Sequence, residues 1–281
     1  MDKIIESIIL GIVQGITEFI PVSSSAHLAF IPWLFNWTEI SESFDLALHL
    51  GTIVALFIYF FKDGISLISS GFGLAIDKIS KKESKAKSEH DGKLFWYIIL
   101  ATIPAGVLSL VLDKVSETIV GNDANREIIC IAIASIIMGT LLYILDQKCS
   151  VQKKYDNLSM KDTLLIGISQ ALAAAFPGVS RSGVTISTSR ALGYDREGSA
   201  KISFLLSIPI ILAAVLVKFK DFDLTYPIPF FLGILFSAIF GLIFINILMK
   251  FLKKGDYKIF AIYRVVFGIV LIAISLFRMF S

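Results

Sequence analysis

Two short polar motifs interrupt otherwise apolar stretches of this sequence, and both carry residue types that act on phosphate. The first contains Gln14, Glu18, Ser23, Ser24 and His27. In a helix, Gln14 and Glu18 lie four residues apart and therefore on one face. Glu18 could act as a general base, orient His27 or bind a divalent cation, while Ser24 or His27 could attack phosphorus. Ser23 is a further candidate for binding phosphate. The spacing leaves open whether Ser24, His27 or water is the nucleophile.

The second motif supplies groups that bind anions. Arg181 offers a planar guanidinium that can bind two phosphate oxygens at once. Ser180, Ser182 and Thr185 add hydroxyl donors, and Gly178 allows backbone N–H groups to approach a ligand closely. A helix that begins near Ser182 would add its free N–H groups and its dipole to the attraction. Together the two motifs predict a phosphate site.

Each of these residues also has an ordinary structural interpretation. Ser and Thr in membrane helices often satisfy backbone groups and pack against neighbours. Glu18 and Arg181 could form an ion pair that only holds two parts of the chain together, and His27 could be a hydrogen-bonded interior histidine. His49 could line a cavity or bond a neighbour, and Arg264 is expected to snorkel or to form a structural pair. We favour chemistry for Glu18 and Arg181, because ionisable groups inside apolar segments are costly and tend to be functional.

The composition indicates an integral membrane protein. Of the 281 residues, 56% are hydrophobic and 17% are charged, and the mean hydropathy is +0.79. A soluble domain has about 25% charged residues. The formal net charge of +3 is small and no basic patch is interleaved with aromatic residues, so we expect no nucleic-acid partner. Cys130 and Cys149 lack metal-ligand spacing and are not expected to form a disulfide.

Six apolar runs are long enough to cross a bilayer, for which a helix needs about 20 residues. They cover residues 45–61, 95–112, 128–145, 200–217, 229–249 and 259–277. Two further apolar segments, 4–35 and 162–195, are interrupted at Pro21 and Pro177 and by the polar motifs. This pattern predicts two re-entrant helical hairpins, because non-helical backbone at membrane depth must be covered by protein or water. Residues 62–94 are predicted to form a cytoplasmic loop.

The two broken segments align with each other at an offset of 156 residues. The matched residues are Gly11, Ile12, Gln14, Pro21 and Ser24 with Gly167, Ile168, Gln170, Pro177 and Ser180. Each segment precedes three spans, so residues 1–146 and 162–281 form two repeats within a single membrane domain, 1–281. An odd number of crossings inverts the second copy. The predicted fold is an all-α integral membrane protein with six transmembrane helices and two re-entrant hairpins in an inverted-topology repeat.

The placement of Lys and Arg predicts the orientation of the chain. Most of these residues fall in 62–94, 146–161 and 250–258. The side of the membrane that is rich in Lys and Arg is the cytoplasmic side. We therefore expect both termini and the opening of the site on the outer face of the membrane. Membrane lipids surround such a chain, and a homodimer is one assembly that we consider.

Both motifs resemble those of a known family. The stretch from Gln14 to His27, QGITEFIPVSSSAH, is similar to the Glu/Gln-x3-Glu region of the BacA-type undecaprenyl pyrophosphate phosphatases. The stretch from Pro177 to Thr185, PGVSRSGVT, resembles their PGxSRSxxT motif. The resemblance covers essentially the whole chain in length and span pattern. Gln14 stands where many members have Glu, which leaves Glu18 and the substrate phosphates as the main ligands expected for a cation.

The resemblance implies a multi-pass enzyme of the bacterial cell membrane. Such an enzyme hydrolyses C55 polyprenyl diphosphate to the monophosphate and inorganic phosphate, which recycles the cell-wall lipid carrier and confers bacitracin resistance. The resemblance also implies a divalent cation, Mg²⁺ or Ca²⁺, near Glu18 and Gln14. The family positions that matter correspond here to Glu18, Ser24, His27, Ser180, Arg181 and Thr185.

Two other classes of protein use similar features. A polyprenyl-phosphate transporter or flippase could use the same inverted-repeat site, because broken helices are typical of transporters. A carrier needs Arg181 but not the nearby nucleophile and base. A type 2 phosphatidic acid phosphatase is disfavoured, because Ser187 stands where its pattern needs His and its Lys/Arg-Pro element is missing.

Overall fold

The part of the chain that the computed structural model describes is built from α-helices. It comprises residues 3–37, 42–80, 88–121, 123–218, 220 and 225–280. The elements are α1 (Lys3–Thr17), α2 (Ser24–Phe35), α3 (Glu42–Tyr59), α4 (Phe61–Ser80), α5 (Glu89–Val120), α6 (Ala124–Lys148), the 3-10 turn η1 (Tyr155–Asn157), α7 (Met160–Ser169), α8 (Leu172–Ala175), α9 (Arg181–Ala191), α10 (Arg196–Val217), α11 (Pro227–Leu252) and α12 (Lys258–Phe280). Within these residues the only extended pairing is one isolated bridge, between Lys153 and Tyr194. The all-α prediction is confirmed.

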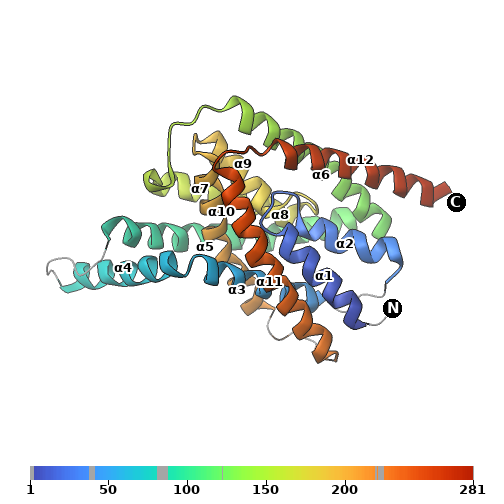
Figure 1. The fold of residues 1–281 in the computed structure, drawn as a ribbon, viewed down its shortest axis with the longest axis horizontal. Coiled ribbons are helices and arrows are strands. Elements are labelled where there is room, and N and C mark those ends of the chain that lie inside the picture. Colours follow the sequence, from blue (N-terminus) through green and yellow to red (C-terminus); the bar gives the residue numbers. More distant parts are fainter. Residues whose placement is uncertain are drawn as a thin grey trace.

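Among the described residues, five helices are long and apolar enough to cross a membrane, namely α5, α6, α10, α11 and α12. Each coincides with one of the predicted spans. A sixth span arises only when α3 and α4 are counted together, because the chain bends by 83° between them. After this bend α4 runs alongside α5 (Figure 1). Five of the six predicted spans are therefore single long helices, and the sixth, 45–61, coincides with α3, the first helix of the bent pair.

The structure corrects the prediction that residues 62–94 form a loop. Most of this segment is helical, because α4 fills its first part and α5 begins within it; residues 81–87 lie outside the described residues. The missing Cβ of Gly71 makes room on α4 for the ring of Phe95. The exposed face of α4 carries large apolar side chains, namely Ile65, Ile68, Phe72 and Ile76. Interspersed Gly, Ser, Asp and Lys lower the average hydropathy of the segment and conceal this helix in the sequence.

Both segments with a predicted break consist of helices separated by a non-helical stretch. Residues 18–23, the first break, separate α1 from α2, and residues 176–180, the second break, separate α8 from α9. Ser23 caps the N-terminus of α2 and Ser180 that of α9, with φ of 78° and 70°. These two caps are one residue further apart than the predicted offset of 156, because Gly178 is an extra residue in the second break. The two breaks thus share a local conformation, but the sequence alignment pairs Ser180 with Ser24, whereas the structurally equivalent cap is Ser23.

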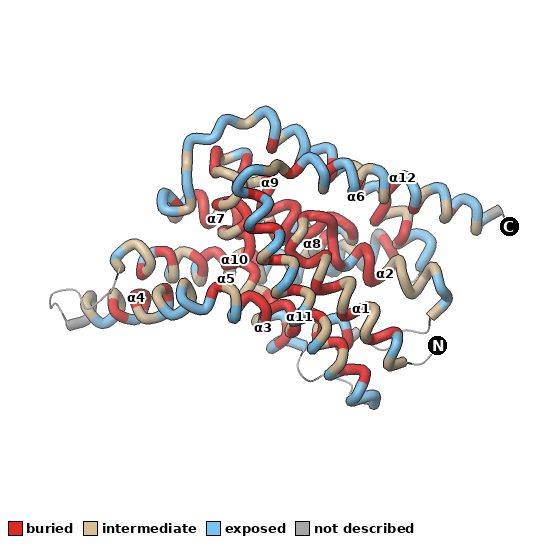
Figure 2. The backbone as a smooth tube through the Cα atoms, viewed as in Figure 1, coloured by how far each residue is buried: buried red, intermediate tan, exposed pale blue. Residues whose placement is uncertain are grey.

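Small residues allow helices from both halves of the chain to pack closely. A Cβ on Gly11 of α1 would lie 2.7 Å from the carbonyl oxygen of Gly233 on α11. Ser237 of α11 donates a hydrogen bond to the carbonyl oxygen of Leu48 on α3 at 2.7 Å. α6 packs along α12, and α9 contacts both α6 and α10. This packing brings the two breaks together in the middle of the molecule, where buried residues are concentrated (Figure 2).

Candidate active site

A cavity of about 750 Å³ lies where the two breaks meet. One group of polar lining residues comes from the two breaks, from the helix starts that follow them and from α3. These residues are Glu18, Ser23, Ser24, Ser25, His49, Ser180, Arg181 and Ser182. The two polar motifs of the sequence, which lie in different halves of the chain, therefore contribute to one cavity.

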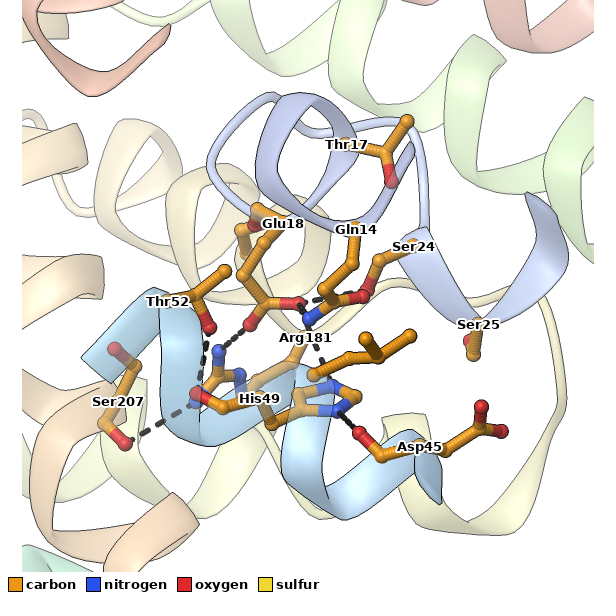
Figure 3. Close-up of polar contacts among 12 residues, drawn as sticks. Gln14, Thr17, Glu18, Ser24, Ser25, Asp45, His49, Thr52, Arg181 and Ser207 are labelled. Carbon is orange, nitrogen blue, oxygen red and sulfur yellow. Dashed lines mark hydrogen bonds and ion pairs between the residues drawn. The ribbon is translucent and has the colours of Figure 1, made fainter. Parts of the chain in front are cut away.

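Glu18 is the centre of the polar contacts in this cavity (Figure 3). One carboxylate oxygen forms an ion pair with Nη2 of Arg181. The other accepts hydrogen bonds from Ser24 Oγ at 2.7 Å and from Gln14 Nε2 at 3.0 Å. The Glu18 side chain is only 5% exposed. Several donors thus compensate the desolvation of a buried carboxylate.

Arg181 links the second break to both Glu18 and α10. It is the first residue of α9, and its Nη1 donates to the carbonyl oxygen of Ser207 at 3.2 Å. Its side chain is 19% exposed, so part of the guanidinium faces the cavity. Guanidinium N–H groups bind phosphate oxygens in a fixed planar geometry. Arg181 can therefore bind an anion that enters the cavity.

The N-termini of α2 and α9 are built in the same way. Ser23 Oγ accepts from the N–H of Ala26 at 3.3 Å, and Ser180 Oγ accepts from the N–H of Gly183 at 3.0 Å. Each cap also contacts the serine two residues later, at 3.1 Å in the first break and 3.3 Å in the second. The first turns of both helices, with their partial positive charge, border the cavity through these serines. Both helix ends favour an anionic ligand.

Ser24 and Glu18 have the geometry of a nucleophile and its base. The hydroxyl of Ser24 donates directly to Glu18, and both residues line the cavity. A hydroxyl nucleophile needs a base within about 2.6–3.2 Å to take its proton. A basic side chain for the anion, a hydroxyl and a carboxylate thus meet at one end of the cavity.

Comparison with known proteins identifies the family. The family model described as "Bacitracin resistance protein BacA" matches residues 7–270. This chain belongs to the BacA family. It is 41% identical over 281 residues to the undecaprenyl-diphosphatase of Pelotomaculum thermopropionicum, covering 99% of each chain. It is 38% identical over 276 residues to that of Moorella thermoacetica, covering 98% of this chain and 99% of the relative. Identity to the undecaprenyl-diphosphatase of Desulforudis audaxviator is 40% over 274 residues, covering 97% and 98%.

In this BacA-family chain, His27 lies apart from the ion pair of Glu18 and Arg181. Its Nδ1 is 2.7 Å from the carbonyl oxygen of Ser23, and its Nε2 is 2.6 Å from the hydroxyl of Tyr263 on α12. Its ring stacks on Phe267 with a centroid distance of 4.5 Å. His27 is not among the described residues that line the cavity. The geometry therefore favours a role in holding the first break over the predicted direct role in catalysis.

Thr185 and Gly178 also lie behind the cavity lining of the BacA-family chain. Thr185 Oγ1 contacts Ser203 Oγ at 2.7 Å and so ties α9 to α10. Gly178 has φ of 86°, and a Cβ there would lie 2.8 Å from the backbone of Ile131 on α6. The space that a side chain at Gly178 would need is occupied by α6. Both residues support the second break.

Two ionisable residues contribute more to the BacA-family site than the sequence alone indicates. His49 donates from Nδ1 to the carbonyl oxygen of Asp45 at 2.8 Å, which leaves Nε2 3.5 Å from Glu18. Arg264 is fully buried and contacts both breaks. In the sequence, the feature that could have identified both residues is a charged or titratable side chain inside an apolar segment. The direction of each side chain depends on helix packing and could not be derived from spacing.

In the BacA-family chain, Gln14 on α1 and Glu18 in the first break carry oxygen atoms of the type that hard cations prefer. Gln14 Oε1 is buried and has no hydrogen-bond partner, and the same amide bonds Glu18 through Nε2. Amide and carboxylate oxygens are ligands for Mg²⁺ and Ca²⁺. Among the described residues, no group of three or more His, Cys, Asp or Glu side chains is placed to hold a metal ion. Gln14 and Glu18 therefore fit a cation that takes its other ligands from a substrate.

The rest of the cavity lining in the BacA-family chain is mainly apolar; its polar members are Thr102, Ser109 and Asp113 of α5 and Lys218, which follows α10. Most of this part of the lining comes from α5 and α10. The lining side chains from α5 include Ile99, Ile103, Val107 and Leu110, and those from α10 include Pro209, Ile210, Ile211 and Val217. One cavity thus combines a charged end with a long apolar wall, as an amphiphilic ligand requires.

Proposed function

We propose that this chain is a membrane-embedded undecaprenyl diphosphatase, which hydrolyses the C55 polyprenyl diphosphate to the monophosphate and inorganic phosphate. The observation that carries this proposal is the meeting of Ser24, Glu18 and Arg181 in one cavity. The names of the relatives from three organisms agree with it. Removal of the diphosphate recycles the lipid carrier for cell-wall synthesis and withdraws the lipid that bacitracin sequesters.

In the reaction that we propose, Ser24 is the nucleophile. Arg181 binds oxygens of the terminal phosphate, which compete with Glu18 for the guanidinium and leave the carboxylate more basic. Ser24 Oγ attacks the terminal phosphorus, its proton passes to Glu18, and the bond from phosphorus to the bridging oxygen breaks. The monophosphate leaves and carries the proton away. Water then attacks the phosphoserine, its proton passes through Glu18 to the departing Ser24 oxygen, and inorganic phosphate is released.

Serines and helix ends supply the remaining contacts to phosphate. Ser23, Ser180 and Ser182 line the cavity beside the N-termini of α2 and α9. Their hydroxyl groups and the free N–H groups of the first helical turns are placed to offset the charge that develops during transfer. His27 and Thr185 hold the two breaks from behind through their bonds to Ser23 and Ser203.

We propose Mg²⁺ or Ca²⁺ as the cofactor, held by Glu18, by Gln14 and by the phosphates of the substrate. The buried Gln14 Oε1 has no hydrogen-bond partner and belongs to the amide whose Nε2 bonds Glu18, which supports this assignment. When bound, a divalent cation offsets the negative charge of the diphosphate. Hard cations are commonly bound by one or two protein oxygens together with substrate phosphates.

The isoprenoid tail occupies the apolar part of the cavity, between α5 and α10. The diphosphate then reaches the polar end without leaving the membrane. We further propose that the two broken segments are re-entrant hairpins of an inverted repeat, as their matching serine caps suggest. The distribution of Lys and Arg supports an opening on the outer face of the cell membrane. The homodimer stays a prediction.

Phosphate release by the purified full-length protein tests the activity. In detergent with Mg²⁺, the wild type should release inorganic phosphate from C55 diphosphate, whereas chelation of the cation or heat inactivation should stop the release. Glu18→Gln should be inactive, while Glu6→Gln, the same change at a buried glutamate on α1, should retain activity. No release by the wild type, or movement of lipid without release, would refute the assignment. Labelled terminal phosphate that stays on wild-type protein but not on Ser24→Ala would identify the nucleophile.

A further inference from the structure

Arg264 on α12 is a fully buried arginine whose side chain lies behind the cavity. Its contacts are with backbone carbonyl oxygens. Nη2 donates to Gly178 at 2.7 Å and to Val179 at 3.1 Å, Nη1 donates to Pro21 at 3.1 Å, and Nε donates to Ser135 at 3.4 Å. A buried charge is costly unless several dipoles solvate it. The carbonyl groups that solvate this guanidinium are therefore held strongly in place.

The carbonyl groups that bind Arg264 belong to both breaks. Pro21 lies two residues before the cap of α2, and Val179 lies directly before the cap of α9. The caps Ser23 and Ser180 have positive φ, which a non-glycine residue adopts only when its surroundings hold it there. One planar guanidinium thus fixes the turn that precedes each cap and the distance between the two turns.

Two glycines leave room for this arginine. A Cβ on Gly183 of α9 would lie 2.8 Å from Nη1 of Arg264, and a Cβ on Gly139 of α6 would lie 2.8 Å from its Cβ. The guanidinium therefore packs directly against the first turn of α9, the turn that carries Arg181. The cavity lining in the described part of the chain does not include Arg264. It reaches the site only through the backbone of the two breaks.

We propose that Arg264 is a positioning residue for phosphate release, which sets the distance between Glu18 and Arg181 by binding the carbonyl groups of both breaks. The proposal rests on the proposed function. Catalysis by positioned groups is sensitive to distance, and a misplacement of about 1 Å can cost about 100-fold in rate. Lys at this position keeps the positive charge but has a single nitrogen in place of the planar fork. It cannot bind the same set of carbonyl oxygens across both breaks.

Arg264→Lys and Arg278→Lys form a matched pair of variants. Arg278 also lies on α12 and donates to two backbone carbonyl oxygens, those of Trp33 and Leu34, both at 2.7 Å. Those carbonyl groups lie at the end of α2, away from the cavity. Both variants keep the charge, so the comparison isolates the contact with the breaks.

The test measures kcat, KM and thermal stability of the full-length variants in detergent, per folded molecule. For Arg264→Lys we expect kcat to fall by about 100-fold, with KM for the polyprenyl diphosphate changed by less than about threefold. Arg278→Lys should retain the wild-type kcat. A wild-type kcat in Arg264→Lys, with loss only of stability or yield, would overturn the proposal. Failure of the proposed function is distinguishable, because the wild type itself would then release no phosphate.

If Arg264→Lys does not fold, two glycine variants test whether Arg264 positions the breaks. Gly139→Ala presses on the Cβ of Arg264, whereas Gly268→Ala perturbs the same contact between α6 and α12 at Ala132, one turn further along. We expect a lower kcat in Gly139→Ala than in Gly268→Ala at comparable thermal stability. Equal kcat values in the two variants would overturn the proposal.

Discussion

The carboxylate of Glu18 and the guanidinium of Arg181 form an ion pair between residues 163 positions apart in sequence. Glu18 comes from the first break and Arg181 from the start of α9, so the pair forms only when both halves of the chain are folded together. Both side chains are largely buried. Breaking such a pair leaves one charge without a partner in a medium of low polarity. In the proposed mechanism, stability and catalysis therefore depend on the same contact, and double substitution can separate them.

Arg181→Ala should lower both activity and stability. Loss of the guanidinium removes a ligand of the phosphate and should reduce kcat/KM by at least about 100-fold. The unpaired Glu18 should cost about 3–5 kcal/mol of unfolding free energy. The double variant Glu18→Gln/Arg181→Ala has no orphan carboxylate, so it should recover most of this stability and remain inactive. Thermal unfolding and phosphate release measure the two effects, and a double variant as unstable as Arg181→Ala would contradict the explanation.

Gln14→Glu should increase the affinity for a divalent cation. The substitution replaces the amide that bonds Glu18, and whose oxygen has no hydrogen-bond partner, with a second carboxylate. Two adjacent carboxylates repel each other, so the variant should be less stable than the wild type in EDTA and should regain stability when Mg²⁺ is added. Thermal unfolding against Mg²⁺ concentration measures this without any reliance on turnover. Gln170→Glu buries a carboxylate elsewhere and is the control; equal responses in both variants would argue against a cation at Gln14.

His27→Ala and Tyr263→Phe should differ in severity. His27→Ala deletes the donor to the carbonyl oxygen of Ser23 and the ring stacked on Phe267. We expect a loss of at least about 100-fold in kcat, because the first break is no longer held. Tyr263→Phe removes only the hydroxyl group that contacts His27 Nε2 and keeps the ring. It should therefore lower the free energy of unfolding by only about 1 kcal/mol. Equal losses of kcat in the two variants would show that the bond to Tyr263 carries the function of His27.

The long apolar helices and the two polar motifs were predictable from sequence, because hydropathy and residue spacing are local properties. α5, α6, α10, α11 and α12 all coincide with predicted spans. The helix α4 was not predictable in this way, because its buried face combines Leu67 with the small residues Ser70 and Gly71. Small residues allow close packing in a membrane but lower the hydropathy on which the prediction depends.

The identity of the site residues was more predictable than their direction. Spacing placed Gln14 and Glu18 on one helix face, and the structure joins them by a hydrogen bond. His27 follows Ser24 by less than one helical turn, yet its partner is Tyr263, 236 residues away. The position of Arg264 likewise depends on how α12 packs against both breaks. Such long-range contacts are set by tertiary structure, which a single sequence does not reveal.

Gly106→Phe should make the enzyme prefer shorter isoprenoid chains. Gly106 of α5 lines the apolar part of the cavity, and a Cβ there would be 3.6 Å from Ile210 on α10, which is ordinary contact. The backbone can therefore accept a side chain, while a phenyl ring would fill space between α5 and α10 that the proposed tail occupies. We expect kcat/KM to fall for C55 diphosphate and to change little for C15 diphosphate, since the charged end of the cavity is untouched.

The matched control for this substitution is Gly64→Phe on α4, where a Cβ would meet no atom within 4 Å. It adds the same ring to another membrane helix outside the cavity, so kcat/KM for both chain lengths should stay near wild type. Initial rates of phosphate release with C15 and C55 substrates, at one detergent concentration, give the ratio directly. An unchanged ratio in folded Gly106→Phe would place the tail elsewhere, because a ring between α5 and α10 cannot share that space with a long isoprenoid chain.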